Sequence, residues 1–193
     1  AIDLGAGEKE RGALETLLSS PATKFEITVG KLMVVSLAGM VSGLISVIGI
    51  SVPFYFIGNI PDQIKSTVIE IISPFIIVSV IILMIPIAIF FASMLLSISF
   101  YARSFKEAQS LMGPLNIIII VPLMLTLGPG IEIDHITALI PLINVGLLTK
   151  EILAGSAQPI YFIETLSSLL FFAAIGIRFS VYWFNKENTI FRV

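Results

Sequence analysis

The sequence predicts an all-α, polytopic integral membrane protein with four transmembrane helices, and three observations support this prediction. First, 56% of the 193 residues are hydrophobic. Second, only 12% are charged, against about 25% in a typical soluble domain, so the charge present cannot cover a water-facing surface of ordinary size. Third, the uncharged runs reach the ~20 residues that a helix needs to cross the hydrocarbon core of a bilayer. A soluble globular fold is therefore excluded, and the lipid bilayer is the expected environment.

Four uncharged or nearly uncharged runs define the expected spans, at 32–56, 71–101, 108–131 and 160–184. The run 71–101 is too short for two spans. We therefore expect one tilted or kinked helix, with Ser73 as N-cap, Pro74 as first helical residue and Pro86 near the middle. The last span contains Arg178, whose long side chain can snorkel to the membrane edge.

The connection 132–159 is expected to be an outer loop. Its uncharged run 136–149 is too short to cross the membrane, and it contains Pro141 and Asn144. These features predict a re-entrant or interfacial segment.

The distribution of basic residues predicts the orientation. Four spans place both ends of the chain on one side, together with the loop that contains Arg103 and Lys106. Of the eleven Lys and Arg residues, only Lys65 and Lys150 fall on the other side. Because cytoplasmic loops are enriched in Lys and Arg, we expect a multi-pass protein of the cell membrane with both ends of this chain cytoplasmic.

A few small or polar residues inside the spans are candidates for helix contacts. Gly39 and Gly43 form a GxxxG pattern, which favours close helix packing, although Gly is also generally frequent in membrane helices. Asn116 and Asn144 are candidates for positions that face a transport pathway or a helix interface; the simpler interpretation is a hydrogen bond that joins helices.

The stretch 6–20 predicts a short cytoplasmic amphipathic helix. Thr23 and Glu26 then predict a capping box that opens the helix leading into the first span. The charged residues are mixed in sign, so they fit a protein surface better than an anionic lipid surface, while a helix lying on the membrane is the alternative. The apolar strip consists of Leu14, Leu17 and Leu18, and the charged residues are Glu8, Lys9, Glu10, Arg11 and Glu15.

The stretch 8–21, followed by Glu26-Ile27 and Gly30-Lys31, resembles the cytoplasmic loop of type-2 ATP-binding-cassette (ABC) transporter permeases, especially the sodium-efflux NatB-like branch. Weaker similarities follow at 102–109, 141–144 and 150–155. The resemblance implies a permease half with six helices, of which this chain, 1–193, would be the C-terminal part that contains the last four. It also implies that 6–20 is a coupling helix that docks in a cleft of a separate ATPase subunit.

The same resemblance implies a division of labour between subunits. The chain has no G-x-x-x-x-G-K-[ST] motif, so ATP and Mg would be bound by the ATPase subunit, and we expect this chain to bind no cofactor and to be no enzyme. A second permease copy, identical or different, and the lipid bilayer are the other expected partners. The residues implied in contact with the ATPase are Glu8, Lys9, Glu10, Arg11, Gly12, Leu14, Glu15, Leu17 and Leu18.

Composition excludes several other function classes. With no Cys and one His, disulfides and Cys/His metal centres are excluded. His135 lies beside Glu132 and Asp134, but one His with two loop carboxylates is more typical of a polar loop than of a metal site. An intramembrane protease would need catalytic groups at membrane depth, where this chain has no His. A net charge of −2 excludes a strongly basic nucleic-acid binder.

The sequence therefore predicts a permease subunit of an ATP-driven ABC exporter, with sodium ions or drugs as the substrates that the resemblance implies. The alternative is an accessory or channel-like integral membrane protein without an ATPase partner.

Overall fold

The computed structural model describes residues 1–56, 73–128 and 130–186, without the side chains of Glu15, Leu18 and 50–56. Every regular element within these residues is a helix. Four of the helices are long and apolar enough to cross a membrane. The predicted all-α fold with four candidate membrane spans is thus confirmed.

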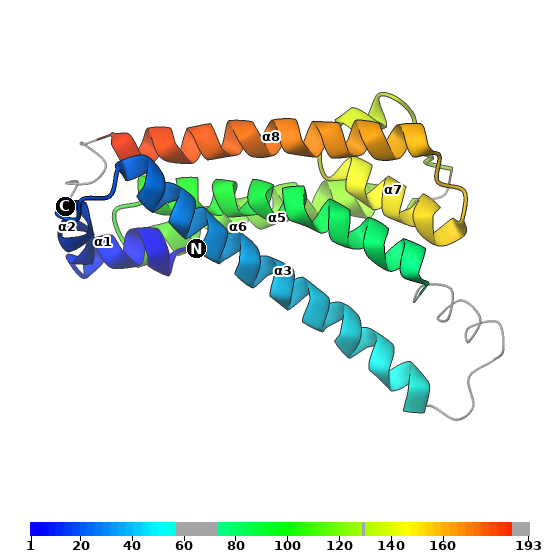
Figure 1. Cartoon of the computed structure of the whole chain (residues 1–193), viewed down its shortest axis with the longest axis horizontal. Coiled ribbons are helices and arrows are strands. Elements are labelled where there is room, and N and C mark those ends of the chain that lie inside the picture. Colours follow the sequence, from blue (N-terminus) through cyan, green and yellow to red (C-terminus); the bar gives the residue numbers. More distant parts are fainter. Residues whose placement is uncertain (57–72, 129, 187–193) are drawn as a thin grey trace.

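The four long helices form an elongated bundle around α5 (Figure 1). α5 packs against each of the other three, and α3 crosses the bundle obliquely and diverges from it along its second half. The bounds are α3 (Lys24–Phe56), α5 (Pro74–Tyr101), α6 (Phe105–Thr126) and α8 (Pro159–Asn185).

Local capping explains where α3 and α5 begin. The Thr23 N–H donates to a carboxylate oxygen of Glu26 at 2.7 Å, and the Glu26 N–H donates to the Thr23 hydroxyl at 3.2 Å. This is the predicted capping box. Ser73 caps α5, Pro74 follows at the first helical position, and the helix continues through Pro86. These three local predictions are confirmed.

α6 differs from its predicted bounds of 108–131. It begins at Phe105, because Ser104 accepts a hydrogen bond from the Glu107 N–H at 3.2 Å and caps the helix. It ends at Thr126, ahead of Gly128 and of Gly130, whose φ of 77° lies in the left-handed region. The predicted span was therefore displaced toward its C-terminal side.

The connection after α6 contains two short helices, the 3₁₀ helix η2 (Thr137–Leu139) and α7 (Ile143–Ala154). α7 packs beside α5, α6 and α8, and its Leu147, Leu148 and Ile152 are buried in one core cluster. The segment expected to be re-entrant or interfacial is thus a helix packed on the bundle, and its depth in the membrane stays a prediction.

The N-terminal segment is not the single helix expected over 6–20. It contains a π-helix, η1 (Asp3–Gly7), then α1 (Glu8–Glu10) and α2 (Ala13–Leu18). The break falls at Gly12, whose φ of 70° only glycine adopts easily. The prediction of one continuous amphipathic helix was wrong for this reason.

Helices α5 and α8 are held close by small polar residues. The hydroxyls of Ser97 and Ser180 lie 2.9 Å apart, and Ser180 also contacts the Ser93 carbonyl oxygen at 2.8 Å. A Cβ added at Gly176 would lie 2.0 Å from the Ser93 hydroxyl oxygen. Small residues thus permit close backbone approach, as in other membrane helix pairs.

Of the two glycines in the GxxxG pattern, one contacts another helix within the described residues. A Cβ at Gly43 would lie 2.8 Å from the Met84 methyl carbon, so Gly43 faces α5. A Cβ at Gly39 would have no heavy atom of the described chain within 4 Å. Within the described residues, Gly43 thus packs against another helix and Gly39 does not.

Candidate functional site

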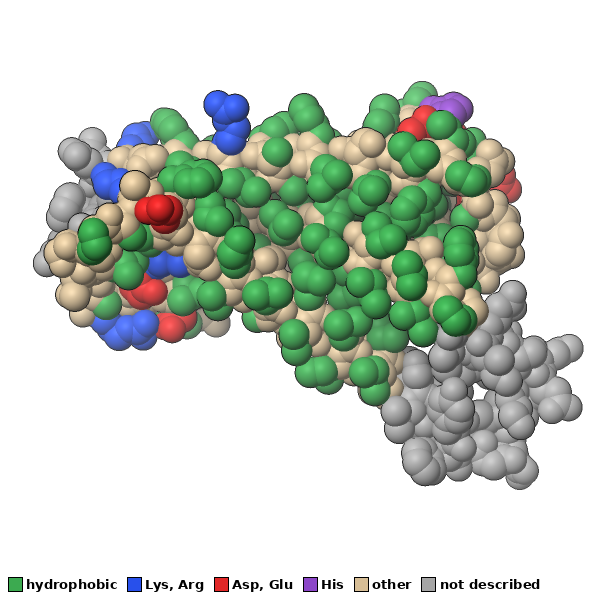
Figure 2. Space-filling view, in the orientation of Figure 1, with side chains coloured by type: hydrophobic (Ala, Val, Ile, Leu, Met, Phe, Trp, Pro, Cys, Tyr) green, Lys and Arg blue, Asp and Glu red, His purple; other side chains and the backbone are tan. Residues whose placement is uncertain are grey.

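Among the described residues, the densest group of polar contacts joins the N-terminal segment to the long helices. Charged side chains gather at the end of the molecule where this segment lies, beside the C-terminal end of α8, and apolar side chains cover the middle (Figure 2). We define the docked segment as residues 2–18, from the N-cap of η1 to the end of α2. It occupies the end where α5 stops and α6 begins.

Glu8 anchors the docked segment to α3. Its carboxylate pairs with the Lys31 ammonium group, which also donates to the Leu4 carbonyl oxygen. The Lys31 side chain is only 8% exposed and the Glu8 side chain 21%. A charge pair with so little exposure must remain intact, because either partner alone would be left charged and poorly solvated.

Lys9 and Glu10 join the docked segment to the turn between α5 and α6. The Lys9 ammonium group donates to the carbonyl oxygens of Phe100 and Ala102, each at 2.9 Å. The Phe105 N–H donates to a Glu10 carboxylate oxygen at 3.1 Å. A cation therefore lies at the C-terminal end of α5 and a carboxylate at the N-terminal end of α6, the arrangement that helix dipoles favour.

Ser99 fixes the start of the docked segment. It accepts a hydrogen bond from the Ala6 N–H at 2.9 Å and donates to the Ile2 carbonyl oxygen at 3.0 Å. A Cβ at Gly5 would collide with this serine, at 2.2 Å from its hydroxyl oxygen. Gly5 is therefore needed for this close approach to α5.

α2 has a buried face and an exposed face. Leu14 is buried with Leu96 and Phe100 of α5, and Leu17 packs on the same cluster. Ala13 and Thr16 are exposed, as are Gly12 and Arg11 before them; Arg11 pairs with Asp3 at 2.9 Å, with 60% of its side chain exposed. We define the outer face as Arg11, Gly12, Ala13 and Thr16.

These contacts give several of the expected coupling residues partners within the chain. Glu8, Lys9, Glu10, Leu14 and Leu17 were expected to meet a partner, but their side chains make the contacts above within the chain. Arg11 and Gly12 are exposed and remain available to a partner. The side chains of Glu15 and Leu18 lie outside the described residues.

Sequence reasoning missed Lys31 and Ser99, which hold the docked segment in place. Lys31 carried a signal, because a lysine about two turns inside an apolar helix needs an acceptor or a route to water. Ser99 carried none, since serine is common in membrane helices.

The two candidate asparagines differ in their surroundings. Asn144 is fully buried: its amide nitrogen donates to the Ala138 carbonyl oxygen at 3.1 Å, and its amide oxygen accepts from the Val145 N–H at 2.7 Å. It therefore joins α7 to η2. Asn116 is exposed on α6, and its expected place on a pathway stays a prediction.

The opposite end of the molecule has its own polar contacts. The Nδ1 atom of His135 lies 2.8 Å from a carboxylate oxygen of Glu164. Hydrogen bonds from the backbone and then the hydroxyl of Thr137 hold the pKa of Asp134 below its usual range. Within the described residues no three His, Cys, Asp or Glu side chains gather as a metal site would require.

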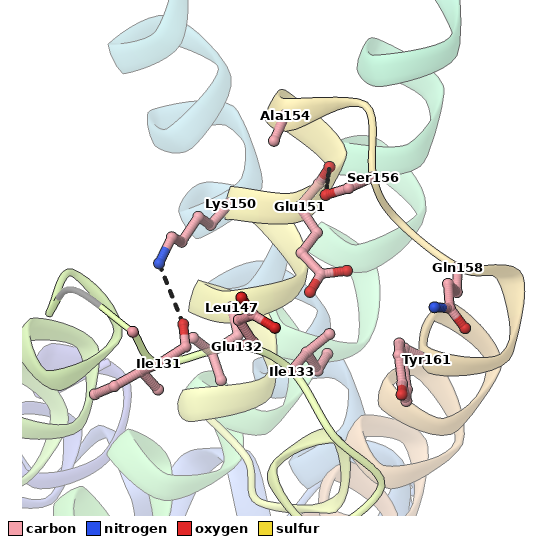
Figure 3. A pocket seen from close by; sticks show the side chains of 11 residues that line it. Ile131, Glu132, Ile133, Leu147, Lys150, Glu151, Ala154, Ser156, Gln158 and Tyr161 are labelled. Atoms are coloured by element: carbon pink, nitrogen blue, oxygen red, sulfur yellow. Dashed lines mark hydrogen bonds between the residues drawn. The ribbon is translucent and has the colours of Figure 1, made fainter.

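A pocket of about 420 Å³ opens at this end between the 130–133 loop, α7 and the start of α8 (Figure 3). Lys150 donates to the Ile131 carbonyl oxygen at 3.2 Å and so ties the loop to α7. Glu132 and Glu151 also line the pocket, which leaves its lining with one excess negative charge.

Comparisons with known proteins agree with this architecture. A family model described as "ABC-2 family transporter protein" matches residues 1–189. The chain is 28% identical over 195 aligned residues to the ABC transporter permease protein NatB of Bacillus subtilis (strain 168). The alignment covers 98% of this chain and 49% of that relative, so the chain spans about half of the relative's length. No solved structure matches the chain.

Proposed function

The chain belongs to the ABC-2 family of transporter proteins, and from this premise we propose that it is part of a permease that couples ATP hydrolysis in a separate ATPase subunit to export. The docked segment is the coupling element: the ATPase subunit binds its outer face. A second permease copy completes the pathway.

The observation that carries this proposal is the connection of one short segment to three membrane helices. Glu8 binds Lys31 of α3, Lys9 binds the last carbonyl groups of α5, and Glu10 binds the first amide of α6. A movement of the outer face is therefore transmitted to all three helices at once. Movement of packed elements as rigid bodies is a common way to link a binding event to a distant change.

The transported substrate is proposed at the level of class. Sodium ions and drugs are the candidates that the family resemblance implies. In the described parts of the four membrane spans, the acidic residues lie near helix ends, at Glu26, Glu107 and Glu164. A tight carboxylate cage for a cation in mid-membrane is thus absent from these spans, and binding of cargo would depend on weaker polar groups or on the second copy.

The proposal is tested by separating binding from coupling in the full transporter. Ala13→Arg and Thr16→Arg place a long cation on the outer face of α2, and we expect them to abolish association with the ATPase subunit. Lys9→Gln and Glu10→Gln weaken the connections to α5 and α6 without changing the outer face. We expect these two variants to retain the ATPase and to lose ATP-driven transport.

The readouts are co-purification of the ATPase and uptake of sodium or organic cations into inverted vesicles. Ser156→Arg, which adds the same charge at the opposite end of the molecule, is the matched control and should leave both readouts unchanged. Normal association and transport in the Ala13→Arg and Thr16→Arg variants would refute the docking surface. Transport that needs no ATP would instead favour the channel-like alternative.

A further inference from the structure

Arg178 is an exposed charge on a membrane-spanning helix. No hydrogen bond or ion pair joins it to another side chain within the described part of the chain. It lies seven positions before Asn185, the last residue of α8, or about 10 Å from the helix end at 1.5 Å per residue. A guanidinium group at this depth is costly unless it reaches water or an anionic group near the membrane surface.

Two apolar grooves lie on either side of Phe179, the residue next to Arg178. The first, of about 660 Å³, lies between α8 and the start of α3, with Phe25, Ile175 and Arg178 among its lining residues. The second, of about 530 Å³, lies between α8 and α5 and is lined by Met94, Ser97, Ile98, Tyr101, Phe179 and Trp183. Phe179 lines both grooves and is 52% exposed.

Both grooves run from the basic end of the bundle toward its middle. The first extends from Asn185 to Ile175 along α8 and the second from Tyr101 to Met94 along α5, which corresponds to lengths of about 15 Å and 10 Å. Their outer ends contain Tyr182 and Trp183, and aromatic residues of this type mark the membrane interface. Deeper than these aromatic residues, the lining is apolar apart from Ser97 and Arg178, and the long Arg178 side chain can extend back toward the polar edge. With the guanidinium group there, the polarity changes along the grooves as it does along a lipid molecule.

Positive charge near Tyr182 and Trp183 selects the head group. Arg178 lines the first groove, and Lys186 places its ammonium group 5.0 Å from the ring centroid of Trp183, which lines the second. No carboxylate is among the residues that line either groove. The guanidinium group matches a phosphate geometrically through paired N–H groups.

We propose that this face of α8 is a binding site for one anionic diacyl phospholipid. Arg178 binds its phosphate, and its two acyl chains occupy the two grooves that Phe179 separates. The two-groove shape fits two chains of one molecule, and the two cations with no acid in the lining favour an anionic head group over a zwitterionic one.

The test is native mass spectrometry of the full-length permease, with phosphatidylglycerol and phosphatidylcholine of matched acyl chains as probes. The wild-type protein should bind phosphatidylglycerol more tightly. Arg178→Gln should lower this affinity about tenfold, the size expected for loss of a hydrogen bond to a charged group. Arg178→Lys keeps the charge but not the planar fork, and it should fall between the two.

Lys106→Gln is the matched control, because it removes one exposed positive charge at the same end of the molecule, outside both grooves. It should change the affinity less than twofold. Phe179→Ala should lower the binding of both lipids alike, because it removes a wall of both grooves and no charge. Thermal unfolding without added lipid verifies that each variant is folded.

Three results would overturn the proposal: equal affinity of the wild type for the two lipids, equal losses in Arg178→Gln and Lys106→Gln, or absence of lipid adducts on the wild type. The last result would mean that another part of the protein covers this face.

Discussion

At the scale of single residues, Lys31 is the side chain on which the coupling element depends most. It lies about two turns inside α3, is 8% exposed, and binds both the Glu8 carboxylate and the Leu4 carbonyl oxygen. Its ammonium group also lies 5.9 Å from the centroid of the Phe100 ring. The contacts with Glu8 and Leu4 join the docked segment to the bundle, whereas the Phe100 contact joins α3 to α5. The Lys31 ammonium group therefore has its counter-ion only while that segment is docked.

This dependence predicts a non-additive pair of substitutions. Glu8→Gln leaves the Lys31 charge without its counter-ion, and we expect a loss of about 3 kcal/mol in the free energy of unfolding, the size found when one partner of a buried pair is removed. The double variant Glu8→Gln/Lys31→Met removes the charge as well and should be closer to the wild type. Unfolding in detergent by denaturant titration measures both.

The matched control is Arg11→Gln, because the Arg11–Asp3 pair has side chains 60% and 63% exposed. Exposed pairs contribute only about 0–1 kcal/mol. A double variant that is less stable than Glu8→Gln alone would show that the charge pair does not control docking.

At the scale of elements, the junction between α1 and α2 determines which side chains meet a partner. A continuous helix over 6–20 would have kept the charged strip and the leucine strip on fixed faces. The left-handed turn at Gly12 instead lets α1 direct Glu8 to Lys31 and Lys9 to the end of α5, while α2 buries Leu14 and exposes Thr16. The break therefore allows one short segment both to bind the bundle and to present an outer face.

Two glycine substitutions should have opposite effects on stability. Gly12→Ala forces a Cβ into the left-handed region, and we expect a loss of about 1 kcal/mol although a Cβ there would have no neighbour within 4 Å. Gly30→Ala, in the interior of α3 and equally free of neighbours, should stabilise the protein by up to about 1 kcal/mol, because alanine favours the helix.

Thermal unfolding of the two variants in the same detergent compares them directly. The identical chemical change makes each the control for the other. A stabilising effect of Gly12→Ala would mean that α1 and α2 form one helix in the membrane, as the sequence pattern had predicted.

At the scale of the whole molecule, the sequence predicted what depends on composition and on neighbours in the chain. The four spans follow from long apolar runs, and the Thr23–Glu26 and Ser73–Pro74 caps follow from residues at most three positions apart. The Glu8–Lys31 pair and the two grooves around Phe179 depend on the packing of distant segments, which no local pattern reports. The break at Gly12 had a weak local signal, because a glycine inside a helical pattern can end a helix. The leucine periodicity, however, indicated one continuous helix.

The arrangement of charge along the bundle predicts the orientation of the chain in the membrane. The docked segment and the α5–α6 turn lie at one end and the α7 region at the other, and the middle is covered by apolar side chains (Figures 1 and 2). Because most basic residues belong to the first end, we expect that end in the cytoplasm.

The chain contains no Cys, so single cysteines introduced by substitution can be labelled without background from this chain. Lys106→Cys should react with a membrane-impermeant maleimide only after the cells are opened, whereas Ser156→Cys should react in intact cells. The reverse pattern would place the docked segment outside the cell, where it could not meet an ATPase, and would refute both the orientation and the proposed coupling.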